Sequence, residues 1–181
     1  MSCNTKFSLL SHQRVIKSFM TKNEIKLSED NLFSDLADII ENRKNRIIRQ
    51  ANNEAVFMFW EVGNRINSEI LKNQRAEYGK QIVYSLNTQL QAKYGAVFNL
   101  RNIQRMMQFA SQFNDVKIVQ SLTSHSRLCW THIVELLPLK DMSAKIYYIN
   151  EVHKGALTVK SLKYLISRKS YERQELGNAQ F

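Results

Sequence analysis

Apolar residues recur at every third or fourth position along residues 32–66. This spacing is the period of an α-helix that buries one face. It predicts one long helix, or two nearly collinear helices, from about Asn31 to about Leu71. Ser28 is its expected N-cap, because the acidic residues that follow suit the positive end of the helix dipole. Gly63 lies inside this helix without a turn partner, and close packing against another helix is the expected reason.

Shorter helical segments follow, and each is bounded by start or stop signals. The first runs from about Tyr78 to Tyr94, and Gly95 is its expected C′ residue. The next begins after Asn99, whose side chain is a good N-cap. Further helices are predicted over residues 115–122, 126–137, 143–155 and 158–176, the third closed by Gly155 and the last, a single helix, capped by Thr158.

The content of glycine and proline also favours helices. Five glycines and one proline are too few turn residues for a many-stranded β fold. We therefore predict an all-α fold in which a long N-terminal helix packs on a bundle of shorter helices with a helix-turn-helix-like arrangement. The expected organisation is a flexible basic extension over residues 1–28, a helical domain over 29–176 and a tail over 177–181.

The helix predicted after Asn99 has an apolar side and a polar side without any carboxylate. At about 100° per residue, the polar side consists of Arg101, Gln104, Arg105, Gln108, Ser111 and Gln112. Arg, Gln and Ser donate hydrogen bonds to phosphates and base edges. The pattern therefore predicts a nucleic-acid contact, and a solvated face that lacks acid by chance is the alternative. The candidate ligands are Arg101, Gln104, Arg105 and Gln108.

The net charge of +10 and the pI near 9.7 favour anionic partners. In the last predicted helix, the auxiliary candidates for phosphate contacts are Lys160, Lys163, Lys169 and Arg173. A second basic cluster lies on the long helix and is interpreted as its solvated outer face. That cluster consists of Arg43, Lys44, Arg46 and Arg49.

Enzyme and metal motifs receive little support. The sequence contains no glycine-rich phosphate loop, no GxSxG and no HExxH. His125, Cys129 and His132 fall on one helical face, as metal ligands can, but a fourth ligand is missing nearby. We interpret them as a packed cysteine and two hydrogen-bonded histidines. No catalytic residue, metal or cofactor is therefore expected in this chain.

Two cysteines, Cys3 and Cys129, give no disulfide framework, which favours a reducing, cytoplasmic location. No apolar run approaches the roughly 20 residues of a membrane span, so no membrane partner is expected. Aromatic residues cluster beside Gly63 and predict a core or an interface between chains. The alternative function is therefore a helical dimerisation or protein-docking module, with the interface formed by Phe57, Phe59 and Trp60.

Five segments in order carry a family resemblance: FWEVGNRI, AEYGKQIVYSLNTQL, FNLRNIQRMMQF, LCWTHIVELL and SYERQEL. Together they resemble the N-terminal domain of the bacterial YhcG-like family, over about residues 35–176. Members of this family have a helical, helix-turn-helix-type DNA-binding region followed by a PD-(D/E)xK nuclease domain. The resemblance implies a DNA-targeting module, with the nuclease domain as its C-terminal partner.

The resemblance also assigns individual residues. The tryptophan–glutamate–glycine pattern falls on Trp60, Glu61 and Gly63, and the EYGK motif falls on residues 77–80. An arginine–asparagine pair falls on Arg101 and Asn102, which adds Asn102 to the nucleic-acid candidates. The tryptophan–Ser/Thr–histidine motif ends at His132, which strengthens the non-metal interpretation, although Ile133 replaces the usual aromatic residue after it.

The catalytic half of that family has no counterpart in this sequence. The nuclease reaction needs an Asp and a Glu/Asp–x–Lys to hold Mg²⁺ and activate water. Pro138 is followed by Leu139, and the EIK at residues 24–26 has no acidic strand before it. The resemblance therefore implies that this chain is not itself the enzyme and that Mg²⁺ belongs to the nuclease domain. The target, DNA or RNA, and the oligomeric state stay open.

Overall fold

The computed structural model describes residues 4–73, 76–124 and 127–178, with side chains described over 29–71, 79–123 and 127–177. Throughout these ranges all regular elements are helices, which confirms the all-α prediction. The chain divides between Ile47 and Ile48 into two units. Each unit is described by itself below.

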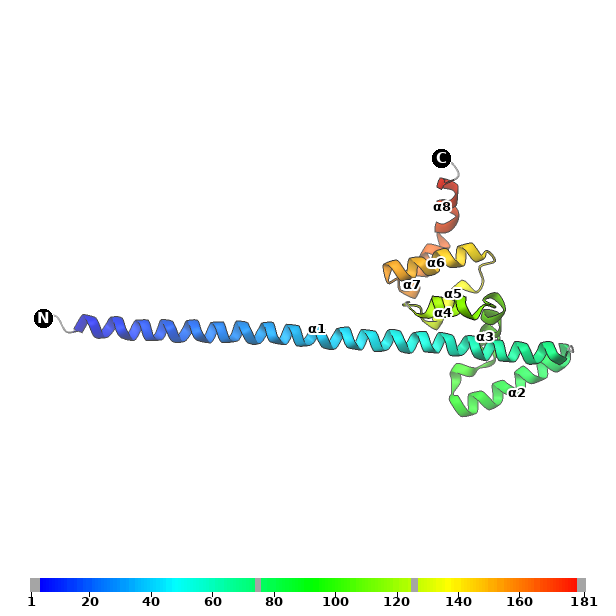
Figure 1. Cartoon of the computed structure of the whole chain (residues 1–181), viewed down its shortest axis with the longest axis horizontal. Helices are drawn as coiled ribbons and strands as arrows, with labels where there is room; N and C mark the ends of the chain where they lie inside the picture. Colours follow the sequence, from blue (N-terminus) through cyan, green and yellow to red (C-terminus); the bar gives the residue numbers. More distant parts are fainter. Residues whose placement is uncertain (1–3, 74–75, 125–126, 179–181) are drawn as a thin grey trace. The chain divides into compact units, whose positions relative to one another are not determined.

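The described part of the first unit is a stretch of one helix. Helix α1 spans Asn4–Asn73 and continues into the second unit (Figure 1). The predicted start near Asn31 is wrong, and Ser28 lies inside the helix instead of capping it. The physical reason is that no glycine or proline interrupts residues 4–62, so a cap-type residue alone does not end the helical pattern. The predicted extension over residues 1–28 is thus helical from Asn4 onward.

The second unit contains the remaining helices. Their order and bounds are α2 (Ala76–Tyr94), the short 3-10 helix η1 (Ala96–Phe98), α3 (Leu100–Gln112), α4 (Val116–Ser124), α5 (Trp130–Leu136), α6 (Met142–Gly155), α7 (Val159–Ser167) and α8 (Ser170–Asn178) (Figure 1). The predicted C′ role of Gly95 is confirmed by its φ of 90°, which a residue with a side chain rarely adopts. The helix-turn-helix-like arrangement of these elements stays a prediction.

The C-terminal part of α1 packs closely against α3, as predicted from Gly63. A Cβ atom at Gly63 would overlap the backbone carbonyl of Met106 on α3. Nearby, the indole Nε1 of Trp60 donates a 2.6 Å hydrogen bond to the carbonyl oxygen of Phe113. Phe59 lies against the rings of Phe98 and Trp130, with centroids 6.2 and 4.8 Å away. These contacts fix α3, η1 and α5 against the long helix.

The aromatic cluster is core, which corrects the interface prediction. Phe59 and Trp60 are each only 5% exposed, and both pack inside this unit. Phe57 is half-buried and stacks on Trp60 at a centroid distance of 5.9 Å. The structural role expected for Trp60 and Gly63 is confirmed. Phe59 and Trp60 are therefore unavailable to a second chain.

The C-terminal region differs from the predicted single helix over residues 158–176. Thr158 caps α7 as predicted, because its side chain accepts a hydrogen bond from the amide of Ser161. Helix α7 nevertheless ends at Ser167, and Lys169 adopts a φ of 50° before α8 begins. The Ser170 hydroxyl donates to the carbonyl of Leu165, which satisfies one of the free carbonyls at this helix end. The chain therefore turns where sequence periodicity predicted continuity.

The end of α6 also differs in detail from the prediction. Gly155 is the last residue of the helix, as expected for a residue that closes it. The left-handed residue that reverses the chain is Ala156, with φ 49°. The glycine therefore does not supply the positive φ that usually explains a glycine at a helix end.

We predict that Gly63→Ala destabilises the fold by about 1–3 kcal/mol, because the added methyl group forces α1 away from the backbone of α3. Urea unfolding followed by circular dichroism measures this loss. Gly177→Ala is the matched control, since a Cβ there meets open space and a helical alanine is equal to or better than glycine. Equal unfolding midpoints for Gly63→Ala and the native chain would contradict the close-packing account.

Candidate nucleic-acid interface

Helix α3 is fixed in orientation by its cap and by its apolar side. The Asn99 side chain accepts a 3.0 Å hydrogen bond from the amide of Asn102, which confirms the predicted N-cap. Ile103 and Met106 are fully buried, and the apolar side continues through Ala110 to Phe113. The opposite side of α3 must therefore face outward.

The outward side carries the predicted cationic and amide groups. Arg101, Gln104 and Gln108 are exposed, and Arg105 is half-buried. Within the described ranges, no ion pair joins Arg101 or Arg105 to a carboxylate. Among the described residues, Gln108 makes only a long, 3.5 Å hydrogen bond to the carbonyl of Leu137. These four side chains form what we call the α3 polar stripe.

The residues on either side of the α3 polar stripe in the sequence also include no acidic residue. No Asp or Glu occurs between Tyr78 and Asn114, a segment that includes most of α2 and all of α3. Two cations of this segment besides those of the stripe, Lys80 and Lys93, are exposed. The positive potential of the stripe is therefore not neutralised by carboxylates from its own segment.

Asn102 is a correction to the predicted ligands. It is 8% exposed, and its amide nitrogen donates a 2.7 Å hydrogen bond to the carbonyl of Val97. Its amide oxygen accepts a 2.8 Å hydrogen bond from the indole of Trp130. The side chain therefore links η1, α3 and α5 and cannot reach a nucleic acid. Asn102 precedes Met106 by four residues, and this spacing places both on the buried side of α3. The sequence interpretation overlooked this signal.

Lys145 is buried and makes a polar contact with Gln112 that sequence reasoning missed. Lys145 is only 2% exposed, and its ammonium group donates a 2.7 Å hydrogen bond to the side-chain oxygen of Gln112. Burial lowers the pKa of Lys145, because the charged form loses its hydration. Gln112 also donates a 3.1 Å hydrogen bond to the carbonyl of Leu137. Gln112 is thus structural, and Lys145 is a cation that cannot bind phosphate.

The auxiliary basic residues lie on the surface but on more than one element. Lys160 and Lys163 belong to α7, Lys169 lies in the turn after it, and Arg173 belongs to α8. All four are exposed. Lys163 makes a 3.2 Å ion pair with Glu135, so its charge is partly compensated. The other three are better placed to attract phosphate.

The Cys129–His132 pair is held by hydrogen bonds. The Sγ of Cys129 lies 3.2 Å from Nδ1 of His132, whose Nε2 lies 3.1 Å from the carbonyl oxygen of Leu157. This agrees with the interpretation of His132 as a hydrogen-bonded histidine, whereas His125 lies outside the described residues. Among the side chains that the structure describes, no group of three or more potential ligands could hold a metal ion.

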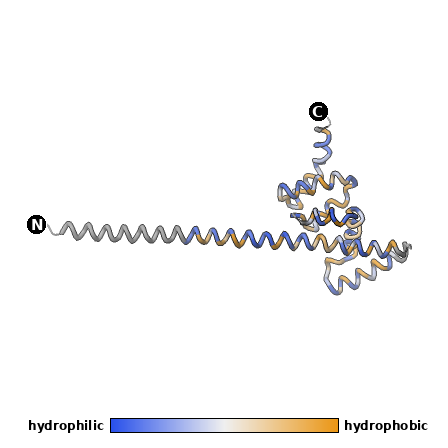
Figure 2. The backbone as a smooth tube through the Cα atoms, viewed as in Figure 1, coloured by the Kyte–Doolittle hydropathy of each residue, from blue (hydrophilic) through white to orange (hydrophobic). Residues whose placement is uncertain are grey.

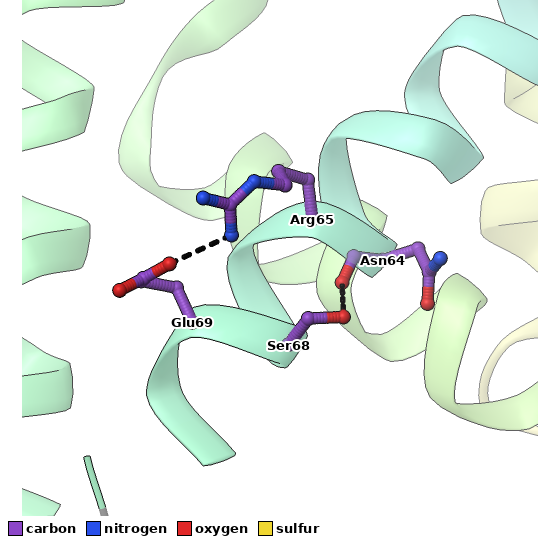
Figure 3. Close-up of polar contacts among 4 residues, drawn as sticks. All are labelled: Asn64, Arg65, Ser68 and Glu69. Carbon is purple, nitrogen blue, oxygen red and sulfur yellow. Dashed lines mark hydrogen bonds and ion pairs between the residues drawn. The ribbon is translucent and has the colours of Figure 1, made fainter. Parts of the chain in front are cut away.

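An apolar groove between α1 and α2 was not predicted. Its volume is about 490 Å³, and its apolar lining consists of Val62, Ile66, Ile82, Leu86 and Leu90. Arg65 and Glu69 also line the groove, and they form an ion pair of 2.8 Å (Figure 3). Next to this pair in the sequence, the Ser68 hydroxyl donates a hydrogen bond to the carbonyl of Asn64. Arg65 is therefore paired, and we do not add it to the cationic candidates.

These features define the chain as an all-α protein with a cationic, carboxylate-poor helix face. The chain belongs to the DUF1016 N-terminal domain family, which it matches over residues 35–173. This agrees with the family resemblance of the sequence segments, and the matched region contains both the α3 polar stripe and the auxiliary basic residues. No curated protein and no solved structure matches the chain significantly. None of the described helices combines the length and hydropathy that crossing a membrane requires.

We predict that the Cys129 thiol loses its proton at a much lower pH than the thiol of an ordinary cysteine does. The hydrogen bond with His132 is the main cause that lowers its pKa to about 6, against an ordinary value of 9.0. The rate of alkylation by iodoacetamide, measured in a Cys3→Ser background, should therefore change little above neutral pH, because the thiolate is already formed.

Two variants test the cause of this shift. His132→Gln should raise the apparent pKa of Cys129, whereas Thr131→Val, which removes a lesser hydrogen bond, should raise it less. An alkylation rate that keeps rising up to pH 9 in the otherwise native chain would contradict the assignment.

Proposed function

We propose that this chain is a non-catalytic nucleic-acid-binding module that contacts DNA through the α3 polar stripe. The observation that supports the proposal most is that Arg101 and Arg105 are not neutralised by a carboxylate of the described residues. Within the described ranges neither arginine has an ion-pair partner, while a carboxylate is close enough to pair with Lys163 elsewhere in the unit. The phosphates of a nucleic acid are the anions that a basic surface of this kind attracts in a nucleic-acid-binding protein.

The spacing of the stripe suits one side of a helix placed in a groove. Arg101, Gln104, Arg105 and Gln108 follow the i, i+3, i+4, i+7 pattern, so they line up on one face. At about 1.5 Å per residue the stripe is roughly 10 Å long, which matches about three base pairs. The major groove of B-DNA admits an α-helix, where Arg pairs with guanine and Gln with adenine.

The auxiliary residues would extend the contact without reading sequence. Lys160, Lys169 and Arg173 are exposed within the same unit as α3. Cations of this kind bind phosphates and fix the orientation of a protein on its duplex. Lys163 contributes less in this proposal, because Glu135 already holds it.

The wider role follows from the family resemblance. We propose that the module delivers a PD-(D/E)xK-type nuclease domain, which would follow it in the full-length protein, to its substrate. The carboxylates and lysine of that reaction, and the Mg²⁺ that they bind, would belong to that domain. The residues of this chain would supply binding and orientation only.

The expected effect of Arg101→Glu/Arg105→Glu is a loss of duplex binding of at least about tenfold at moderate salt, because two phosphate or base contacts become repulsive. Fluorescence anisotropy over a salt series measures it. The slope of log Kd against log salt should also become shallower by about 1 for each arginine that no longer binds a phosphate. A branched duplex and a single-stranded RNA in the same series identify the preferred nucleic acid.

The control for this experiment is Lys117→Glu/Lys154→Glu. It changes the net charge by the same amount at two exposed positions outside the stripe. If only net charge matters, both double variants should lose duplex binding equally, and that result would contradict a specific role for α3. Circular dichroism must show native helicity in both, since buried Ile103 and Met106 are neighbours of the substituted arginines.

A further inference from the structure

The described part of the first unit exposes an apolar stripe on α1. Phe33, Ile40 and Ile47 repeat at seven-residue intervals, with Leu36 and Ile39 on the same side. Phe33 is 74% exposed and Ile47 is 66% exposed, and the three others are about half exposed. Figure 2 shows hydrophobic positions at intervals along this helix. We call these five residues the α1 stripe.

Such a stripe is costly to leave in water. Most helix stability in proteins comes from packing an apolar face, and contiguous exposed apolar patches mark interaction sites. A seven-residue repeat is the spacing at which two helices wind around each other with their apolar seams in contact. The α1 stripe is thus suited to another long helix rather than to a small ligand.

The charged residues near the α1 stripe indicate which long helix its partner is. Residues 29–41 carry five carboxylates and no lysine or arginine. Residues 42–47 carry Arg43, Lys44 and Arg46 and no carboxylate. Two copies side by side in parallel would place like charges at the same level. Two antiparallel copies that pair position 29 with position 47 would instead place Glu29 and Asp30 of each beside the basic segment of the other, while Asp35, Asp38 and Glu41 lie on sides of the helix away from the seam. The two ends of the stripe are therefore complementary to each other in charge only when the partner is reversed.

We propose that the chain forms a homodimer in which the α1 stripes of two copies pair antiparallel. With the seven-residue repeat in register, Leu36 packs against Ile40 of the second copy at the centre of the seam. Phe33 then lies opposite Arg43 of the second copy, where a cation over the ring is favourable. At the flank, Asp30 faces Lys44 of the second copy.

The existing contacts of the single chain do not oppose this pairing. Lys44 makes an ion pair with Glu41 at 2.7 Å, but both side chains are 60% exposed. An exposed pair of this kind contributes little to stability, so Lys44 can exchange its partner at small cost. The proposal uses residues other than Phe57, Phe59 and Trp60, so it is independent of the interface first predicted. It also uses none of the residues of the α3 polar stripe.

The first experiment measures the mass of the chain by multi-angle light scattering after nucleic acid has been removed by nuclease and salt. A mass near twice the 21.2 kDa of one chain supports the dimer. The variant Phe33→Glu/Ile40→Glu/Ile47→Glu should return to the mass of one chain. The matched control Asn31→Glu/Asn42→Glu/Asn45→Glu adds the same three charges on other sides of the same helix and should stay dimeric.

A mass of one chain for the native protein at every concentration up to sub-millimolar would overturn the proposal. So would dimers in both triple variants, since the dimer would then use another surface. A complex that forms only with a different protein would also overturn it. Circular dichroism confirms that each variant keeps its helical content, so that loss of the dimer is distinguished from unfolding.

The second experiment tests the orientation by disulfide cross-linking in a Cys3→Ser/Cys129→Ser background. In the antiparallel register, position 29 of one copy lies beside position 47 of the other. A mixture of Glu29→Cys and Ile47→Cys chains should therefore cross-link, and each variant alone should not. Cross-linking of each variant with itself, with none between the two, would assign a parallel dimer and overturn the antiparallel proposal.

Discussion

The close approach of α1 and α3 at Gly63 is the constraint on which the rest of the second unit depends. The absence of a side chain at Gly63 lets the long helix meet the backbone of Met106 directly. The indole of Trp60 then holds the end of α3 through the carbonyl of Phe113. Because these contacts bury one side of α3, they also decide which of its residues remain outside. The α3 polar stripe is thus a consequence of helix packing.

The same packing explains why some candidate residues were predictable and others were not. The cap Asn99 and the apolar side of α3 follow from local spacing, which a single helix determines by itself. Asn102 is different, because its role depends on Trp130 and Val97, which approach it only in the folded chain. Lys145 likewise looks like a surface cation in the sequence, but in the folded chain it is buried and Gln112 accepts its hydrogen bond.

Helix ends were the less predictable part of the fold. Ser28 has the chemistry of a cap but lies within α1, since nothing before it breaks the helix. Lys169 has no such chemistry, yet it takes a left-handed conformation and separates α7 from α8. That turn is stabilised by backbone and hydroxyl hydrogen bonds near it, including the contact of Ser170 with Leu165. Periodicity reports which side of a helix is apolar more reliably than it reports where the helix stops.

The placement of carboxylates connects the two proposals. Acid is absent from residues 78–114, where a polyanion is proposed to bind, and Glu29 and Asp30 lie where a second copy would supply cations. The central claim is that the α3 polar stripe touches nucleic acid. Its most direct test is an NMR titration that follows the guanidinium and amide resonances of the chain as duplex DNA is added. The account predicts that the largest shifts fall on Arg101, Arg105, Gln104 and Gln108. Shifts confined to other helices, with the resonances of α3 unchanged at saturation, would contradict it.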